Sequence, residues 1–230
     1  MMKILILTKP GFEPAAQIAT FLRKEGHMVA KISEKIPKDV LENLGGFDLG
    51  ISVHYKHILD KDTIDSFKYG VMNIHPGYLP YGRGADPIIW SMVNDWPLGI
   101  TIHWIDEGID TGNILYQIEI ERFPLETGEQ LYNRMVGYYE YVFGIFWSVF
   151  DRFLQKDKLV SGTKQDLKES SLHKPRKRSD LLKLGNLTDS RELKIMLALS
   201  HSQHNNMYTF DEFGNKYWVK LTLERADATK

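Results

Sequence analysis

Short apolar runs alternate with amphipathic stretches from the first residues of the chain to about residue 122. A short, almost wholly apolar run predicts a buried strand, and apolar residues three to four positions apart predict a helix. Lys3–Leu7 is the first predicted strand, and Pro14–Glu25 is the first predicted helix, which Gly26 ends. Alternation of this kind is typical of βα units around a mostly parallel sheet, so the pattern indicates an α/β fold.

The same periodicities assign the elements that follow along the chain. Further strands are expected at His27–Ile32, Asp48–Val53, Gly70–Ile74, Gly99–Ile105 and Asn113–Glu121. Helices are expected over Lys61–Phe67, Asp86–Asn94 and Gly128–Leu154, with Asp86 as the N-cap of the second of these. The last helix carries aromatic residues around much of its circumference, which predicts burial on two sides, against the sheet and against a partner or the C-terminal part.

The composition changes after this aromatic helix. Residues 156–183 hold nine Lys and Arg against four Asp and Glu, a basic excess that marks the end of the first domain. We expect one α/β domain over residues 1–158 and a small C-terminal subdomain over residues 159–230. The subdomain is predicted to contain a helix over Arg191–Leu199 and a β-hairpin of Met207–Phe210 and Tyr217–Leu223, with Gly214 in the turn.

The composition is that of a folded globular protein, with 43% hydrophobic and 26% charged residues. The 29 Lys and Arg nearly cancel the 30 Asp and Glu, so no overall field favours nucleic acid or an anionic membrane as a partner. The absence of cysteine excludes disulfide bonds, a thiolate nucleophile and cysteine-bound zinc. The first apolar run is too short for a signal peptide, and no run approaches the ~20 residues of a membrane span. We therefore expect a cytoplasmic protein.

Two local motifs have more than one interpretation. The basic string His173-Lys-Pro-Arg-Lys-Arg178 could contact nucleic acid, although the balanced charge and the lack of interleaved aromatic residues favour a solvated or substrate-facing loop. His54 and His57 have a spacing that occurs in zinc sites. No third ligand of suitable spacing follows them, so no metal is expected.

Residues 71–112 carry the candidate chemistry. Asn73 and His75 lie two apart at the end of a predicted strand, so their side chains leave the same face of the sheet, where open α/β sheets bind ligands. Asp110 follows the next strand in a glycine-flanked turn, and it reaches the same face if the two strands are neighbours. Each residue alone is more often structural. Together, an amide, an imidazole and a carboxylate that raises the imidazole pKa can catalyse acyl transfer without a covalent nucleophile.

Four motifs in this region follow one another in a distinctive order and spacing. They are Asn73-Ile-His-Pro-Gly-Tyr-Leu-Pro80, Arg83-Gly84 with Pro87, Gly99-Ile-Thr-Ile-His103 and Asp106-Glu-Gly-Ile-Asp-Thr-Gly112. They resemble the signature of formyltransferases that use 10-formyl-tetrahydrofolate, and the resemblance is dense over about residues 48–121. It implies a Rossmann-like fold, a reduced folate as formyl donor, and Asn73, His75 and Asp110 as the catalytic residues.

The resemblance also implies where the two substrates bind. It places the pterin of the folate between His57, Ile58 and Leu59 on one side and Ile105, Asp106, Glu107, Gly108 and Ile109 on the other. It places contacts with the acceptor at Lys9, Tyr78 and Arg83. It further implies that Asn73 and a protonated His75 stabilise a tetrahedral oxyanion while Asp110 holds the imidazole.

Departures from the family pattern narrow the acceptor. Glycinamide ribonucleotide formyltransferases carry a Gly-Ser-Asn phosphate loop where this chain has Thr8-Lys-Pro-Gly-Phe-Glu-Pro14, and methionyl-tRNA formyltransferases append a β-barrel where this chain has a short tail. The tail and the string Pro80-Tyr-Gly-Arg-Gly84 resemble the nucleotide-sugar N-formyltransferases. The resemblance therefore implies formyl transfer to the primary amine of a nucleotide-linked amino deoxysugar, such as a 4-amino-4,6-dideoxyhexose, as in O-antigen or surface-glycan biosynthesis.

Other functions stay open at this point. They are formyl transfer to methionyl-tRNA or glycinamide ribonucleotide, hydrolysis of the formyl folate by water, and folate binding without catalysis. The apolar excess of the aromatic helix and the hairpin also predicts a homodimer, since a small tail can hardly cover so many aromatic residues.

Overall fold

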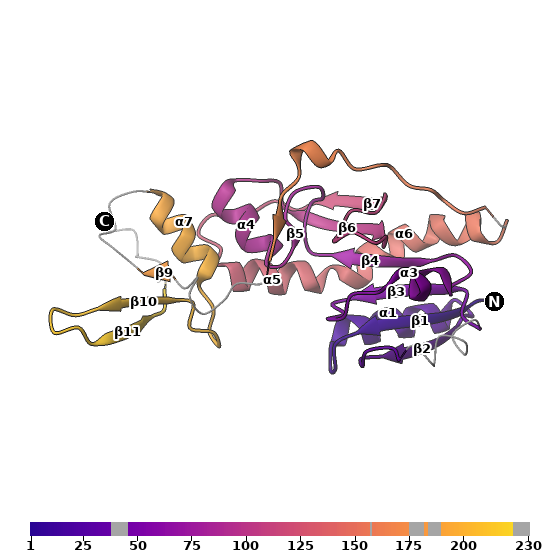
Figure 1. The fold of residues 1–230 in the computed structure, drawn as a ribbon, viewed down its shortest axis with the longest axis horizontal. Coiled ribbons are helices and arrows are strands. Elements are labelled where there is room, and N and C mark those ends of the chain that lie inside the picture. The colour runs from indigo at the N-terminus through magenta and orange to yellow at the C-terminus, as the bar shows by residue number, and fades with distance from the viewer. Residues whose placement is uncertain (38–45, 157, 175–181, 184–189, 223–230) are drawn as a thin grey trace, which may run out of the picture.

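The computed structural model describes residues 1–37, 46–156, 158–174, 182–183 and 190–222 (Figure 1). Among these residues, six strands form the main sheet in the order β2-β1-β3-β4-β6-β7. They are β1 (Lys3–Thr8), β2 (Met28–Ile32), β3 (Leu49–Val53), β4 (Val71–His75), β6 (Gly99–Trp104) and β7 (Ile114–Glu119). The first four strands of the chain pair in parallel, whereas β6 pairs antiparallel with β4 and β7 antiparallel with β6. The expected α/β class and mostly parallel sheet are confirmed.

Burial explains why the central strands are almost wholly apolar. Ile4–Leu7 of β1 and every residue of β3 are buried, which requires cover on both faces of the sheet. Continuous apolar runs of this kind are typical of parallel strands with helices on both sides. β2 lies at the edge, and its residues are half-buried or exposed.

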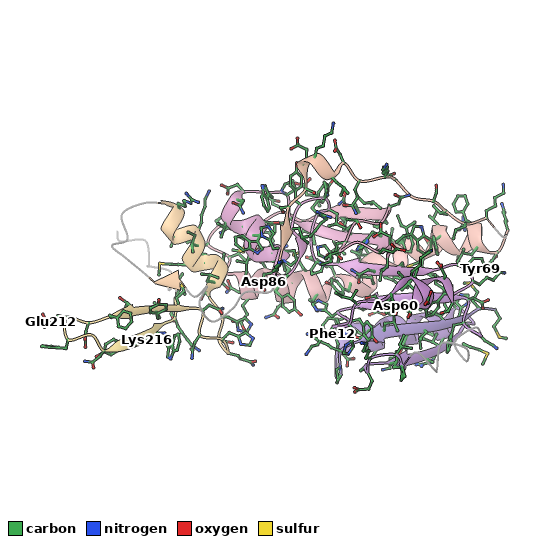
Figure 2. All side chains as sticks on the ribbon, viewed as in Figure 1. Phe12, Asp60, Tyr69, Asp86, Glu212 and Lys216 are labelled. Atoms are coloured by element: carbon green, nitrogen blue, oxygen red, sulfur yellow. The ribbon has the colours of Figure 1, made fainter. Side chains whose placement is uncertain are left out.

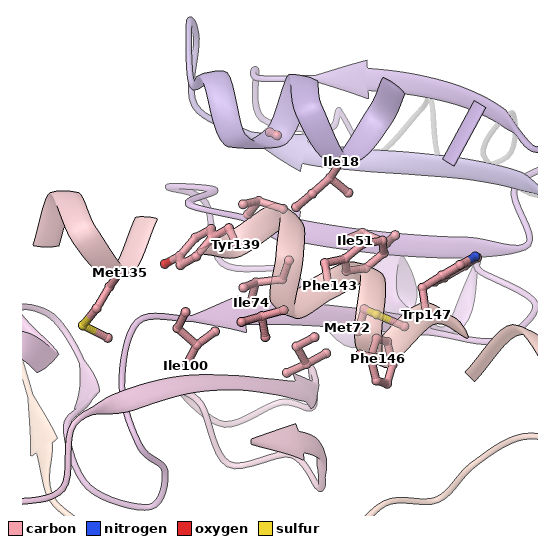
Figure 3. Packing of buried hydrophobic residues seen from close by; sticks show 14 of the residues in the cluster. Ile18, Ile51, Met72, Ile74, Ile100, Met135, Tyr139, Phe143, Phe146 and Trp147 are labelled. Atoms are coloured by element: carbon pink, nitrogen blue, oxygen red, sulfur yellow. The ribbon is translucent and has the colours of Figure 1, made fainter. Parts of the chain in front are cut away.

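Helices α1 (Glu13–Lys24) and α6 (Tyr139–Leu154) cover one face of the sheet and form the main hydrophobic core with it. They contact each other through Phe21 and Phe143, whose ring centroids are 6.1 Å apart. Figure 3 shows buried aromatic side chains of α6 beside strand residues such as Ile51 and Met72. The short helix α3 (Lys61–Asp65) follows β3.

The aromatic stretch forms two helices rather than the single helix expected over Gly128–Leu154. α5 (Gly128–Gly137) starts with a capping box of Thr127 and Gln130, and α6 follows after Tyr138. At the junction, after the poor helix former Gly137, the Tyr138 N–H donates to the carbonyl three residues back, which ends the regular pattern of α5. α5 packs on α7 of the C-terminal part, whereas the side of α6 that faces away from the sheet is exposed in the single chain, so its burial against a partner stays a prediction.

Helix α4 (Pro87–Asn94) begins where expected, but Asp86 does not cap it as expected. Asp86 has a left-handed backbone with φ of 55°, and its side chain makes no capping hydrogen bond. A capping carboxylate needs an extended backbone at the N-cap position. Asp60 has that backbone in front of α3, and its side chain does accept from the Thr63 N–H.

A strap of residues 158–174 runs from the end of α6 back over β7 and β6 (Figure 1). It contains the 3₁₀ helix η2 (Leu167–Glu169) and the strand β8 (Leu172–His173), which pairs with β5 (Arg83–Gly84). Ile114 of β7 and Thr163 of the strap exchange two backbone hydrogen bonds of 2.8 Å. The strap packs with the first domain, although the composition predicted a domain boundary at Lys158.

The C-terminal residues form α7 (Ser190–Leu199) and a hairpin of β10 (Met207–Phe210) and β11 (Lys216–Val219), with β9 (Leu182–Lys183) beside β10. The expected helix and hairpin are confirmed, with Gly214 at the turn. α7 packs against α4 and α5, and the hairpin projects from the body of the molecule with Glu212 near its tip (Figure 2). Among the described helices, none has the length and apolar character needed to cross a bilayer.

Candidate active site

Strands β4 and β6 bring three polar side chains together on one face of the sheet. In their antiparallel register Asn73 pairs with His103, and His75 pairs with Thr101. Paired residues on neighbouring strands point to the same face, as do residues two apart on one strand. The two strands are therefore neighbours as expected, and strand pairing alone collects Asn73, His75 and His103.

His103 orients the amide of Asn73. Its Nδ1 lies 2.7 Å from the Trp104 carbonyl, which can only accept, so Nδ1 carries the proton in the neutral ring. Nε2 of His103 then accepts from Nδ2 of Asn73 at 3.2 Å. One amide hydrogen of Asn73 is held in this way, and the other can be donated to a ligand.

His75 is also oriented by a carbonyl group. Its ring is only 4% exposed, and Nε2 lies 3.0 Å from the Gly82 carbonyl oxygen. Nε2 is therefore the donor, and Nδ1 is the nitrogen that can exchange a proton. Gly77 leaves room for the ring, because a Cβ at residue 77 would lie 2.7 Å from Nε2.

Asp110 reaches the site from a loop that folds back over the sheet. Because β6 is antiparallel to β4, Trp104 pairs with Met72, and the chain must return across the face to approach His75. Oδ2 of Asp110 lies 3.6 Å from Nδ1 of His75 and accepts from the Gly84 N–H at 2.8 Å. Oδ1 lies 3.6 Å from Nε2 of His103. The structure thus brings the three predicted residues into one cluster, with His103 as a fourth member.

Burial decides the protonation of the cluster. Burial lowers the pKa of His75, and it outweighs the upward influence of Asp110. The sequence suggested a raised pKa and a protonated ring; the enclosed site instead favours the neutral imidazole, because desolvation disfavours its charged form. Burial would raise the pKa of the Asp110 carboxyl, but His75, His103 and the Gly84 N–H together hold it well below its usual range, so Asp110 is ionised.

The two loops that the resemblance assigns to the pterin pack on one apolar cluster. Leu59 and Ile105 both contact this cluster, whose buried members are Leu5, Leu7, Ile36, Phe67 and Val71. Ile58 and Ile109 on the same loops are 81% and 46% exposed. Exposed apolar side chains on both loops suit a flat, partly apolar ligand.

Other residues of the two loops shape the loops themselves. Asp106 accepts from the Gly108 N–H at 3.0 Å and from the Thr111 hydroxyl at 2.5 Å. Gly108 allows this tight turn, because a Cβ there would lie 2.0 Å from the Thr111 oxygen. His57 packs its ring against Tyr55, and Glu107 is close enough to Lys61 to contribute to the raised pKa of that lysine, which Asp65 mainly causes.

A cavity of about 580 Å³ lies beside the cluster around His75. Pro76, next to His75, and His54, after β3, lie on its wall, and α5 contributes Glu129 and Tyr132. The C-terminal subdomain supplies another part of the wall, namely Ala198, Leu199, Ser200, His201, Gln203, His204 and Asn206. The cavity has the size of a typical small-molecule site, and it is complete only with the C-terminal residues in place.

Glu129 fastens this C-terminal wall to α5. Its carboxylate accepts from the Ser202 N–H at 2.7 Å and from the Ser202 hydroxyl at 2.6 Å, and it lies 3.4 Å from Nδ1 of His201. Gly128 permits the close approach, because a Cβ there would lie 2.2 Å from the Ala198 carbonyl oxygen.

Of the three acceptor contacts implied by the resemblance, Lys9 lines the cavity and Tyr78 and Arg83 do not. Tyr78 lies beside Gly99 of β6. Arg83 donates from Nη1 to the Ile109 carbonyl at 3.4 Å, which braces the Ile105–Ile109 loop. Contacts of these residues with an acceptor remain predictions.

Sequence reasoning missed the roles of two histidines. His103 belongs to the Gly99–His103 motif. An antiparallel pairing of its strand with β4 would have predicted that His103 lies beside Asn73. His54 has its ring 4.6 Å from Phe12 and 5.8 Å from Tyr132, and its Nε2 lies 3.5 Å from the Tyr139 hydroxyl. These aromatic residues come from separate parts of the chain, so no local pattern predicts the group.

The structure describes the two ambiguous motifs only in part. No group of three or more His, Cys, Asp or Glu side chains in the described part of the chain is arranged to hold a metal ion. In the basic string, His173 stacks on Trp90 with ring centroids 4.1 Å apart. Residues 175–178 of that string lie outside the described residues.

Comparison with known proteins defines the class of this protein. The sequence profile described as "Formyl transferase" matches residues 5–140, which contain the cluster around His75 and both loops. The match covers more than half of the chain, and the chain belongs to the formyl transferase family.

Similar proteins include sugar N-formyltransferases. The chain is 29% identical over 194 residues to dTDP-4-amino-4,6-dideoxyglucose formyltransferase of Mycobacterium bovis, which covers 82% of this chain and 79% of that protein. A 4-N formyltransferase from Francisella tularensis has a TM-score of 0.82 and 26% identity, over 98% of this chain and 99% of that one. The formyltransferase PseJ from Anoxybacillus kamchatkensis, solved with UDP-4,6-dideoxy-4-formamido-L-AltNAc and tetrahydrofolate, has a TM-score of 0.63 and 33% identity, over 75% and 85%.

Burial of His54 predicts a loss of stability in mild acid. Burial, with smaller effects of Lys9 and His75, lowers its pKa from 6.5 to about 4. Between pH 6.5 and about 4, His54 is protonated in the unfolded chain but not in the folded chain. The free energy of unfolding therefore falls by at most about 3 kcal/mol as the pH falls through this window.

The measurement is urea unfolding at pH 7 and pH 4.5 for the parent and for His54→Phe, which keeps an aromatic ring and does not titrate. We expect a smaller difference between the two pH values in the variant. Some difference remains, because the pKa values of His27 and His201 are also lowered. Equal pH dependence in the two proteins would contradict the assignment to His54.

Proposed function

We propose that this enzyme transfers a formyl group from 10-formyl-tetrahydrofolate to the primary amine of a nucleotide-linked amino deoxysugar. The cavity of about 580 Å³ is the observation that carries the proposal, since it adjoins His75 through Pro76 and has room for a nucleotide-linked sugar. The pterin loops and the cavity both adjoin the cluster, so donor and acceptor can meet there. The acceptors named for the Mycobacterium bovis relative and bound to PseJ support this class.

The transfer is direct. The neutral amine attacks the formyl carbon, and Asn73 donates its second Nδ2 hydrogen to the oxyanion that forms. The new ammonium group gives a proton to Nδ1 of neutral His75, where the ionised Asp110 stabilises the imidazolium. The imidazolium then protonates N10 of the folate as the bond between N10 and the formyl carbon breaks. Tetrahydrofolate and a formamide leave, and His75 is neutral again.

The folate pterin binds against the exposed side chains of Ile58 and Ile109, in contact with the loops of residues 57–59 and 105–109. The tetrahydrofolate in the PseJ structure supports a folate donor. We place the reaction in the cytoplasm, where reduced folates and nucleotide sugars are made. The formylated sugar then serves surface-glycan assembly, such as that of lipopolysaccharide.

A panel of acceptors tests the proposed substrate class. Amino sugars linked to dTDP, UDP, GDP and CMP are incubated with 10-formyl-tetrahydrofolate, and the release of tetrahydrofolate is followed. We expect release only in the presence of an amino sugar, with the highest kcat/KM for one nucleotide. Equal release without acceptor would identify a hydrolase. Faster formylation of methionyl-tRNA or glycinamide ribonucleotide would overturn the acceptor class, and folate binding without any release would overturn catalysis.

Variants of the cluster test the mechanism. Asn73→Ala removes a donor aimed at charge that exists only in the transition state, so kcat should fall about 100- to 1000-fold. His75→Asn should cost at least as much, because the proton carrier is lost, and Asp110→Asn should cost a similar factor, because the imidazolium loses its counter-charge. Tetrahydrofolate affinity, measured by calorimetry, should stay within about tenfold, since most pterin contacts lie on the two loops. Parental turnover of Asn73→Ala or Asp110→Asn, with chemistry rate-limiting, would rule out this mechanism.

We also propose a homodimer, supported by two apolar surfaces that the single chain leaves exposed. One lies on α6, with Tyr141, Ile145, Val149 and Phe153, and the other on the hairpin, with Phe210, Phe213, Tyr217 and Trp218. Light scattering at micromolar concentration should give the mass of two chains, and Val149→Lys and Trp218→Lys show which surface is buried. The mass of a single chain for the parent protein would contradict the dimer.

A further inference from the structure

We infer that Gln165 is a positioning residue for Asp110, and that the strap of residues 158–174 sets the geometry of the catalytic cluster through this side chain. The inference rests on the proposed function, because it assumes that Asp110 acts in formyl transfer. Gln165 lies outside residues 5–140, which the family profile matches. It stands 55 positions after Asp110, so only the fold brings the two together.

The carboxamide of Gln165 holds the turn at the carbonyls of Asp110 and Gly112, on either side of Thr111. Its Nε2 donates to the Asp110 carbonyl at 3.0 Å and to the Gly112 carbonyl at 2.7 Å. The side chain is only 6% exposed, and Oε1 has no hydrogen-bond partner among the described residues. A buried, unpaired acceptor is unfavourable for folding. Because Oε1 makes no hydrogen bond there, the amide of Gln165 supports the turn only through the two hydrogen bonds that its N–H groups donate.

The turn that carries Asp110 needs this support. Asp110 has φ of 51°, in the left-handed region that residues with a side chain rarely adopt. Gly112 comes so close to the next segment that a Cβ there would lie 1.9 Å from the Trp104 carbonyl oxygen. The Gly84 N–H holds the Asp110 carboxylate, but the backbone beneath it is held by Gln165. Without the amide, the turn can relax and carry the carboxylate away from His75.

The strap is fixed on both sides of Gln165, so the amide has a defined position. Before it, the Trp104 indole N–H donates to the Val160 carbonyl at 2.8 Å, and Thr163 pairs with Ile114. After it, the Ser171 hydroxyl accepts from the Gly82 N–H at 3.0 Å, and the Ser171 carbonyl accepts from the Arg83 N–H at 3.0 Å.

The contact of Ser171 with Gly82 links the strap to His75. Gly82, which donates to Ser171, also supplies the carbonyl that orients His75. The strap therefore touches both loops that hold the catalytic pair, at Gln165 for Asp110 and at Ser171 for His75. This placement explains how a segment outside the family signature can set the distance between the two groups.

The first test is the kinetics of Gln165→Leu, which keeps most of the bulk and removes both donors. We expect kcat to fall about 10- to 100-fold, as for a small misplacement of a catalytic group, with KM for donor and acceptor close to parental. The matched control is Asn113→Ala, which removes another amide bond from the same loop to the strap, Nδ2 to the Ser161 carbonyl at 2.9 Å, without touching Asp110. The control should keep parental kcat.

A double-mutant cycle separates positioning from general damage. If Gln165 acts through Asp110, Gln165→Leu should have almost no further effect on kcat in the Asp110→Asn background. The thermal midpoint of each variant reports whether it is folded. Should Gln165→Leu fail to fold, Gln165→Asn takes its place, since its amide is one methylene too short to reach both carbonyls.

Titration of His75 by NMR gives a readout that is independent of turnover. The resonances of its imidazole are assigned with His75→Asn. Because Asp110 pulls the pKa of His75 upward, loosening Asp110 should lower the midpoint of His75 in Gln165→Leu and leave it unchanged in Asn113→Ala.

The outcomes distinguish failure of this inference from failure of the proposed function. Parental kcat in folded Gln165→Leu, an undiminished loss in the Asp110→Asn background, or an equal loss in Asn113→Ala would overturn the positioning role. Full activity of Asp110→Asn would instead overturn the catalytic role of Asp110. In that case the His75 titration still tests whether Gln165 positions Asp110. An unchanged midpoint in Gln165→Leu would show that Gln165 does not control the contact between Asp110 and His75.

Discussion

Strand β6 runs against the direction of β4, and the cluster of polar side chains around His75 depends on that reversal. The antiparallel register sets His103 beside Asn73 and places Thr101, rather than another titratable group, beside His75. It also makes β6 end near the start of β4, so the following loop has to cross the face of the sheet before β7 begins. One crossing loop therefore carries both Asp110 and residues 105–109, for which we propose a contact with the pterin.

Carbonyl groups and burial then define which proton states this cluster can hold. The carbonyls of Trp104 and Gly82 each occupy one nitrogen of a histidine, and this leaves Nε2 of His103 as an acceptor for Asn73 and Nδ1 of His75 as the site of proton exchange. The Gly84 N–H donates to Asp110 in this enclosed site and so favours the ionised carboxylate. With His75 neutral at rest, the attraction between His75 and Asp110 is greatest once the proton has arrived. Stabilisation that appears during the reaction, rather than before it, is what lowers a barrier.

Local sequence patterns predicted the parts of this structure that local physics determines. The six strands of the main sheet and the helices α1, α4 and α7 follow from apolar periodicity, and the cluster of Asn73, His75 and Asp110 follows from motif order and a resemblance. The capping role of Asp86 was wrong because it depended on a backbone angle that tertiary contacts set. The neutral state of His75 was missed because a sequence shows that a carboxylate is near but does not show how completely protein encloses the ring.

The parts that sequence patterns did not reveal are contacts between distant segments, and they are the contacts that complete the site. His54, Phe12, Tyr132 and Tyr139 meet only after β3, α1 and the two aromatic helices have packed. The wall around Ser202 is held at the cavity by two residues at the start of α5. Glu129 accepts hydrogen bonds from Ser202, and Gly128 leaves room for the Ala198 carbonyl. The cluster that we propose for formyl transfer thus lies within the family-matched residues, whereas the far wall of the cavity comes from residues 198–206, beyond that match. Because α7 packs on α4 and α5, the position of this far wall relative to His75 depends on the packing of residues that no local sequence pattern brings together.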